Sequence, residues 1–134
     1  MSTVLVVDDE YQITEILAWA LEDAGYQVKK AANGRKALEV LLEALGEVRI
    51  DLVITDYMMP IMNGAELAEA IRSNAQFEAM PVILMSGAQA SIGMEKPDLF
   101  SAVFVKPFDM NTMVAKVRTL IGSAEAGLET PDLE

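Results

Sequence analysis

Apolar residues follow two patterns along this chain: short unbroken runs, and longer stretches in which they recur three or four positions apart. Unbroken runs are typical of strands covered on both faces, and the wider spacing is typical of one face of a helix. The runs predict five strands, near Thr3 to Val7, Tyr26 to Ala31, Leu52 to Ile54, Val82 to Met85 and Ala102 to Val105.

Four stretches with helical spacing follow the first, second, third and fifth strands. The apolar positions that we expect to face the core are Ile13, Ile16, Leu17, Ala20, Leu21, Ala24, Ala37, Leu38, Leu41, Leu42, Leu45, Leu67, Ala68, Ile71, Met110, Met113, Val114, Val117 and Ile121. Gly25 and Gly122 are predicted to end the first and last helices, and Asp109 is predicted to cap the last one at its start.

The segment between the fourth and fifth strands is less regular. Gly93 and Pro97 interrupt it, so we expect a fourth helix that is short or irregular. Strands that alternate with helices predict an α/β fold, a doubly wound five-stranded parallel sheet with helices on both faces. The length suits one domain, which we place at residues 1–122. Residues 123–134 carry four acids and no base, and we expect a disordered tail.

Composition excludes several kinds of chemistry. The chain has no cysteine and no histidine, which excludes disulfides, thiolate nucleophiles, His-ligated zinc and Ser-His pairs. A net charge of −11 with scattered basic residues argues against nucleic-acid binding. The apolar runs are too short to span a bilayer, and the amino terminus lacks the basic region of a signal peptide. We therefore expect a cytoplasmic protein without membrane insertion.

Chemically reactive residues stand where four of the predicted strands end. Asp8 and Asp9 follow the first strand, Asp56 the third, Ser86 the fourth and Lys106 the fifth. The carboxyl ends of parallel strands meet at one edge of the sheet, where open α/β sheets bind their ligands. We therefore expect these five side chains to converge there.

Three carboxylates in one crevice repel one another unless a cation joins them. Because the chain offers no histidine or cysteine, an all-oxygen site for a hard cation is expected, and Mg²⁺ fits best. Lys106 and Ser86 would suit the non-reacting oxygens of a phosphoryl group, which leaves Asp56 as the nucleophile. A purely structural interpretation stays open, in which Asp56 caps a turn, and Glu10 and in part Asp9 favour the start of a helix. Pro60 and Gly64 are predicted to shape the loop after the third strand and start the next helix, without a chemical role.

Four motifs occupy these strand ends in order: VVDDE (6–10), TDYMMPIMNG (55–64), MSG (85–87) and VKPF (105–108). With them, residues 3–122 resemble the receiver domain of bacterial two-component response regulators, in its stand-alone form. The resemblance implies a flavodoxin-like fold. It also implies a signalling phosphoacceptor, not an enzyme, with a sensor histidine kinase or phosphotransfer protein as donor and an unidentified downstream protein as target.

The resemblance assigns a role to each site residue. Asp56 would accept the phosphoryl group from a phosphohistidine, with Ser86 and Lys106 on its oxygens. Lys106 would precede a cis peptide bond to Pro107. The Mg²⁺ ligands would be Asp9, Asp56 and the backbone carbonyl of Met58, with Asp8 acting largely through water.

Some positions depart from the family pattern. Val103 stands where the family usually has an aromatic ring that reports phosphorylation, and we expect the neighbouring Phe104 to face the other side of the sheet. Met58 and Ala88 border the path of the attacking water in the family, and neither can orient a water molecule, which predicts slow loss of the phosphoryl group.

Two other functions remain open at this point. A pseudo-receiver would bind partners without being phosphorylated. A Mg²⁺-dependent phosphatase with an aspartyl nucleophile would need a second acid two positions after Asp56, where this chain has Met58.

Overall fold

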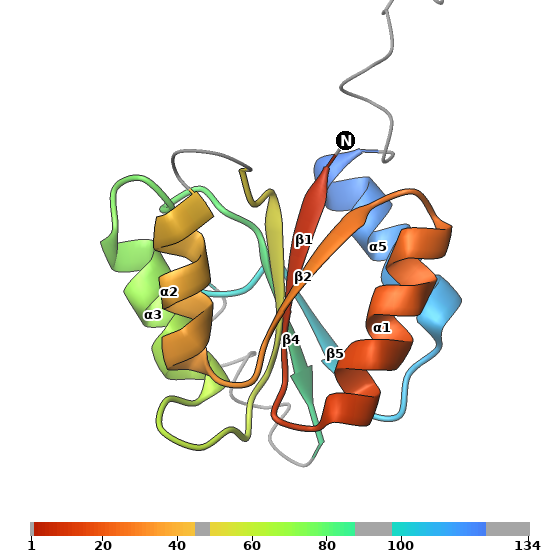
Figure 1. The fold of residues 1–134 in the computed structure, drawn as a ribbon, viewed down its shortest axis with the longest axis horizontal. Helices are drawn as coiled ribbons and strands as arrows, with labels where there is room; N and C mark the ends of the chain where they lie inside the picture. Colours follow the sequence, from red (N-terminus) through yellow and green to blue (C-terminus); the bar gives the residue numbers. More distant parts are fainter. Residues whose placement is uncertain (1, 45–48, 88–97, 123–134) are drawn as a thin grey trace, which may run out of the picture.

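The computed structural model describes residues 2–44, 49–87 and 98–122 (Figure 1). Its elements in chain order are β1 (Thr3–Val7), α1 (Tyr11–Asp23), β2 (Gln27–Ala31), α2 (Gly34–Ala44), β3 (Leu52–Asp56), α3 (Gly64–Ser73), β4 (Val82–Ser86), β5 (Ala102–Val105) and α5 (Met110–Ile121). The irregular fourth helix predicted around residues 88–97, the predicted tail at residues 123–134 and Leu45 lie outside the described residues.

All five strands form one parallel sheet with the order β2-β1-β3-β4-β5. In Figure 1, α1 and α5 cover one face of this sheet, and α2 and α3 cover the other. The predicted doubly wound α/β fold is confirmed. Because the strand order reverses on the two sides of β1, the carboxyl ends of β1 and β3 lie side by side at the switch point of the sheet.

The unbroken apolar runs are explained by burial on both faces, since successive side chains of a strand point to opposite sides. Val4, Ile54 and Met85 pack in a cluster with residues of α1 and α5. Leu5 and Leu84 pack in a second cluster with residues of α2 and α3. The core is therefore two layers separated by the sheet, and β1, β3 and β4 are buried along their whole length.

Two predicted core positions are wrong. Ile16 is 50% exposed and Leu42 is 53% exposed. In α1 the buried line includes Thr14, whose hydroxyl donates to the carbonyl of Tyr11 at 2.8 Å and is thereby satisfied inside the core. A hydrophobicity pattern cannot recognise such a threonine, so it shifts the predicted face toward Ile16. In α2 the buried line passes through Leu41, which leaves the next residue on the outer side.

The predicted helix ends are confirmed. Gly25 and Gly122 have φ angles of 100° and 83°, a region that favours glycine, at the ends of α1 and α5. Asp109 caps α5 by accepting the backbone N–H of Thr112 at 3.0 Å. Within the described part of the chain, every helix is too short or too polar to cross a membrane.

Candidate functional site

The five predicted site residues all lie at the carboxyl-end edge of the sheet. Asp8 and Asp9 follow β1, Asp56 and Ser86 are the last residues of β3 and β4, and Lys106 follows β5. The register holds this edge together, because the backbone N–H of Lys106 donates to the carbonyl of Ser86 at 2.8 Å. The predicted convergence is found in the structure.

The three carboxylates form one cluster. Each of Asp8, Asp9 and Asp56 offers an oxygen, and these oxygens lie within 4.8 Å of one another. Asp8 is 2% exposed and Asp56 is 6% exposed, whereas Asp9 is open to solvent. Two buried acids and one exposed acid at this spacing place high negative charge at the mouth of the sheet.

Lys106 is the cation of this cluster. Its Nζ lies 2.9 Å from Oδ1 of Asp56, 3.5 Å from Oδ2 of Asp8 and 3.9 Å from Oε1 of Glu10. The peptide bond between Lys106 and Pro107 is cis, as predicted. Glu10 was predicted only as a residue that favours the helix start, and its approach to Lys106 is a contact that the sequence did not reveal.

The electrostatics of the cluster favour an additional positive charge. Burial raises the pKa of the Asp8 carboxyl from 3.8 to about 6, although the backbone N–H of Glu10 donates to its Oδ1 at 2.8 Å and opposes the rise. Burial also raises the pKa of Asp56, against the hydrogen bond from Lys106. Burial disfavours the charged form of Lys106, but the carboxylates of Asp56 and Asp8 outweigh it and raise its pKa.

Among the described residues, two buried polar atoms at this edge have no hydrogen-bond partner: Oδ2 of Asp8, which lies 3.5 Å from Lys106 Nζ, and Oγ of Ser86. Such atoms are rare inside proteins, because leaving one unpaired costs roughly 1–3 kcal/mol. The oxygen donors of Asp8, Asp9 and Asp56 match the preference of Mg²⁺, and the chain contains no histidine or cysteine for a softer metal. The residues present therefore fit a magnesium site.

The loop after β3 is held tightly against the cluster. The backbone N–H of Gly64 donates to the carbonyl of Tyr57 at 2.9 Å, and a Cβ on Gly64 would lie 2.4 Å from the carbonyl oxygen of Asp56. Asn63 and Glu66 cap the start of α3 reciprocally. Gly64 was predicted only to shape the loop. Its close approach to the backbone of Asp56 is a positioning role that only the fold reveals.

The remaining predicted residues have mixed positions. Met58 is 60% exposed and lines a shallow hollow with Asp9 and Asn63, beside the carboxylate cluster. Ala88 lies outside the described residues. Val103 packs against the α2–α3 cluster, and Phe104 packs on the opposite face, with its ring centroid 5.5 Å from that of Phe108. The predicted opposite orientation of positions 103 and 104 is confirmed.

The model of the response regulator receiver domain family matches residues 4–118, nearly the whole described chain. The chain belongs to this family. The predicted resemblance to a receiver domain of two-component response regulators is thereby confirmed, and its stand-alone form stays a prediction.

Among its curated relatives are three regulators. The chain is 29% identical to the phosphate regulon transcriptional regulatory protein PhoB of Pseudomonas aeruginosa, over 98% of this chain and 58% of PhoB. It is 33% identical to the response regulator Rre1 of Synechocystis, over 98% of this chain and 58% of Rre1. It is 30% identical to the DNA-binding dual master transcriptional regulator RpaA of Synechocystis, over 90% of this chain and 49% of RpaA. The chain thus spans about half the length of these relatives.

Solved structures agree with this assignment. The response regulator TrrA of Thermotoga maritima, in complex with Mg²⁺-BeF, is 32% identical with a TM-score of 0.76, over 90% of this chain and 99% of TrrA. The chemotaxis protein CheY4 of Vibrio cholerae is 32% identical with a TM-score of 0.74, over 90% of this chain and 98% of CheY4.

Proposed function

We propose that this receiver domain accepts a phosphoryl group on Asp56 from the phosphohistidine of a sensor histidine kinase or phosphotransfer protein in the cytoplasm. The observation that carries the proposal is the position of Asp56. Its carboxylate ends a buried strand, 2.9 Å from Lys106 Nζ and within 4.8 Å of two further carboxylates. A carboxylate in this setting is a nucleophile held next to charge that can stabilise a phosphoryl group.

The transfer exchanges one bond for another. A carboxylate oxygen of Asp56 forms a bond to phosphorus, while the bond from phosphorus to the donor imidazole nitrogen breaks and its electron pair returns to the imidazole. Lys106 would then turn from the Asp56 carboxylate to a phosphoryl oxygen. The hydroxyl of Ser86, which has no hydrogen-bond partner among the described residues, can donate to a second phosphoryl oxygen. These contacts stabilise the negative charge of the transferred group.

We also propose that Asp8, Asp9, Asp56 and the backbone carbonyl of Met58 hold Mg²⁺. When bound, this ion neutralises charge on the carboxylates and on phosphoryl oxygens. This assignment is supported by the mutual proximity of the three acids and by Oδ2 of Asp8, which has no hydrogen-bond partner among the described residues. The TrrA structure supports it by likeness, because that relative is in complex with Mg²⁺-BeF.

The proposed role is that of a signalling phosphoacceptor and not of an enzyme with a separate substrate. The product of the transfer stays on the chain, and Met58 offers no acid or base two positions after the nucleophile. The phosphorylated form would change conformation to control a downstream protein or pass the phosphoryl group on. A net charge of −11 disfavours direct contact of these residues with nucleic acid.

The proposal is tested by incubating the protein with Mg²⁺ and acetyl phosphate and measuring its intact mass. We expect one added phosphoryl group in the wild type, none in Asp56→Asn, and one in the matched variant Asp51→Asn, which changes the aspartate just before the first residue of the same strand. An unlabelled wild type would instead support a pseudo-receiver. Sustained release of inorganic phosphate from many equivalents of donor would support a phosphatase.

A further inference from the structure

A second hollow lies at the other edge of the sheet, at the amino ends of β3 and β4, opposite the carboxylate cluster. It has a volume of about 340 Å³. We name it the amino-edge hollow, and its principal lining residues are Leu41, Ala44, Arg49, Ile50, Phe77 and Met80. No residue of the carboxylate cluster contributes to it.

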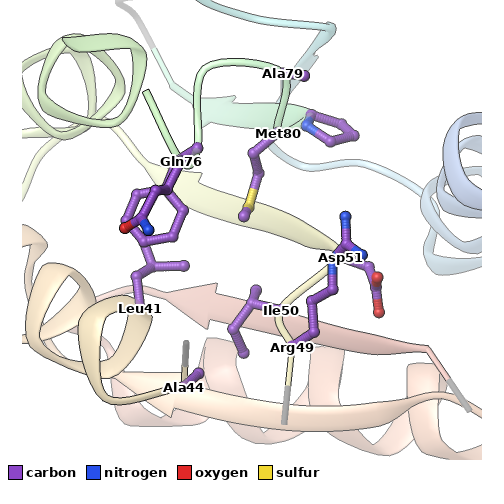
Figure 2. A pocket seen from close by; sticks show the side chains of 10 residues that line it. Leu41, Ala44, Arg49, Ile50, Asp51, Gln76, Ala79 and Met80 are labelled. Carbon is purple, nitrogen blue, oxygen red and sulfur yellow. The ribbon is translucent and has the colours of Figure 1, made fainter. Parts of the chain in front are cut away.

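Much of the wall of the amino-edge hollow is apolar, with Gln76, Arg49 and Asp51 as its polar lining residues. Leu41 is 1% exposed, and Ile50 and Phe77 are each 4% exposed, so they belong to the core and turn one side to the hollow. Figure 2 shows the side chains of Leu41, Ile50 and Met80 arranged around one space from three directions. A concave apolar wall of this size is what small-molecule sites usually present, together with a few polar groups that fix orientation.

Charged groups stand on one side of the hollow, where Figure 2 shows Arg49 next to Asp51. Asp51 is engaged, because its Oδ2 accepts the backbone N–H of Thr3 at 2.9 Å. Arg49 has neither an ion pair nor a hydrogen bond with any residue that the structure describes. A guanidinium presents a planar fork of donors that matches a carboxylate. The hollow thus combines a largely apolar wall with one cation that has no partner among the described residues.

We propose that the amino-edge hollow binds a small apolar molecule that carries a carboxylate. The hydrocarbon part would lie against Leu41, Ile50 and Met80, and the carboxylate would pair with Arg49. Two kinds of molecule share this chemistry: a short-chain carboxylic acid, and an apolar α-amino acid, whose ammonium group would face Asp51. This activity is separate from the proposed phosphoacceptor function, since the two sites share no residue.

The test is an NMR titration of the ¹⁵N-labelled full chain with three probes of matched chain length: hexanoate, norleucine and hexylamine. A ligand of this size binds with a Kd on the order of 1 mM, so each probe is raised to about 10 mM. We expect hexanoate or norleucine to shift the amide signals of Leu41, Ile50 and Met80 in a saturable way, while those of Asp8 and Asp56 stay in place. Tighter binding of norleucine than of hexanoate would identify the amino-acid class, and the reverse would identify simple carboxylic acids.

Three variants make the result specific. Arg49→Gln should weaken binding about tenfold, the loss of one charge-assisted contact. Arg35→Gln, which removes an exposed arginine of α2, should bind as the wild type does. Ala79→Trp, which fills the exposed rim, should abolish binding. Unchanged signals elsewhere in the spectrum verify that each variant is folded.

The proposal is overturned if hexanoate and norleucine both leave these amides unshifted, if hexylamine binds as well as hexanoate, or if Arg49→Gln binds as well as the wild type. Labelling of Asp56 by acetyl phosphate is measured on the same variants and should be unchanged. Loss of labelling in the wild type would remove the phosphoacceptor proposal and leave the binding result standing.

Discussion

The two edges of the sheet treat their polar groups in opposite ways. At the amino-end edge, Asp51 accepts the backbone N–H of Thr3. There Arg72, from the last turn of α3, donates to the carbonyl oxygens of Met80 at 2.7 Å and Leu99 at 3.0 Å. At the carboxyl-end edge, Oδ2 of Asp8 and Oγ of Ser86 are buried without a hydrogen-bond partner in the part of the chain that the structure describes. Apart from Arg49 at the amino-edge hollow, the charged groups named at the amino-end edge are engaged by backbone atoms, and we call it the closed edge. We call the carboxyl-end edge the open edge.

The same strands supply both edges, so strand composition does not explain the difference. β3 begins just after Asp51, which accepts the backbone N–H of Thr3, and ends at Asp56. β4 begins two residues after Met80, whose carbonyl accepts from Arg72, and ends at Ser86. Buried groups without partners and crowded carboxylates lower stability, and such features persist where an incoming group will satisfy them. The difference therefore marks the carboxyl-end edge as the one that gains most from an incoming charged group.

The largest expected effect comes from breaking the closed edge. Arg72→Met keeps most of the side-chain volume but removes the donors to Met80 and Leu99, and two longer contacts at 3.4 Å to Glu78 and Asp98. We expect a loss of roughly 3–4 kcal/mol in the free energy of unfolding, because hydrogen bonds from a charged group contribute about 1.5–3 kcal/mol each. Urea unfolding followed by circular dichroism measures it.

The matched control for that experiment is Arg35→Met, at an exposed position of α2. It should change the free energy of unfolding by less than about 0.5 kcal/mol. A similar small change for Arg72→Met would show that its carbonyl contacts do not stabilise the amino-end edge.

The next effect comes from relieving the open edge. In the metal-free protein, the folded-state pKa of Asp8 is about 6 and its ordinary value is 3.8. The folded state thus holds this proton more tightly than the unfolded chain, so stability is lost as the pH rises from about 4 to about 6 and stays low above that. A shift of this size corresponds to about 3 kcal/mol. Asp8→Asn cannot ionise and still accepts the N–H of Glu10.

We therefore expect metal-free Asp8→Asn to be more stable than the wild type at pH 7.5 and to lose that advantage near pH 4. Urea unfolding in the presence of a chelator, at both pH values, provides the comparison. Asp51→Asn at the closed edge should show no such gain. If Asp8→Asn is less stable than the wild type at pH 7.5, the strain that we assign to the open edge is absent.

A smaller effect is expected from Mg²⁺, which should supply the charge that this edge lacks. At a free concentration ten times its Kd, a ligand that binds only the folded state adds about 1.4 kcal/mol of stability. We expect Mg²⁺ to raise the free energy of unfolding of the wild type by about this amount, measured by thermal unfolding. In Asp9→Ala the increase should be small. Asp23→Ala, at the far end of α1, should respond as the wild type does. An equal response of Asp9→Ala would place the ion elsewhere.

The sequence predicts the open edge better than the closed one, for a physical reason. Asp8, Asp56 and Lys106 follow apolar runs, and any parallel sheet brings the ends of such runs together, so their convergence needs no knowledge of packing. Arg72 and Gly64 act through backbone atoms of distant segments, which no local pattern records. Whether a residue meets a carbonyl oxygen or a neighbouring backbone is decided only when the helices dock on the sheet.

The failures at Ile16 and Leu42 have the same origin. Both have the hydrophobicity of core residues, and both lie on helices whose buried line passes through other positions. The hydroxyl of Thr14 is satisfied by the backbone one turn earlier, so a polar residue occupies the position that an apolar pattern would reserve for isoleucine or leucine. Sequence periodicity thus predicts that a helix is present more reliably than it predicts which of its residues face the core.

The smallest expected effect concerns how far a change at the open edge spreads. Val103 lies on β5 opposite Leu84 and packs on the α2–α3 face, where a short side chain that is branched at Cβ cannot swing as a ring could. Val103→Tyr should therefore leave labelling of Asp56 within about twofold of the wild type, since the side chain at position 103 packs on the α2–α3 face.

Ser86 and Lys106 would move toward the phosphoryl group, and the segment that leaves Ser86 is the first to feel this shift. We expect the largest change in hydrogen exchange, on adding beryllofluoride and Mg²⁺, between Ser86 and Phe100. Residues 88–97 lie outside those that the structure describes, so this expectation rests on Gly93 and Pro97, which disfavour a regular helix there. A strong response confined to α5, where Phe104 and Phe108 pack, would instead route the signal through that aromatic pair on the other face of the sheet.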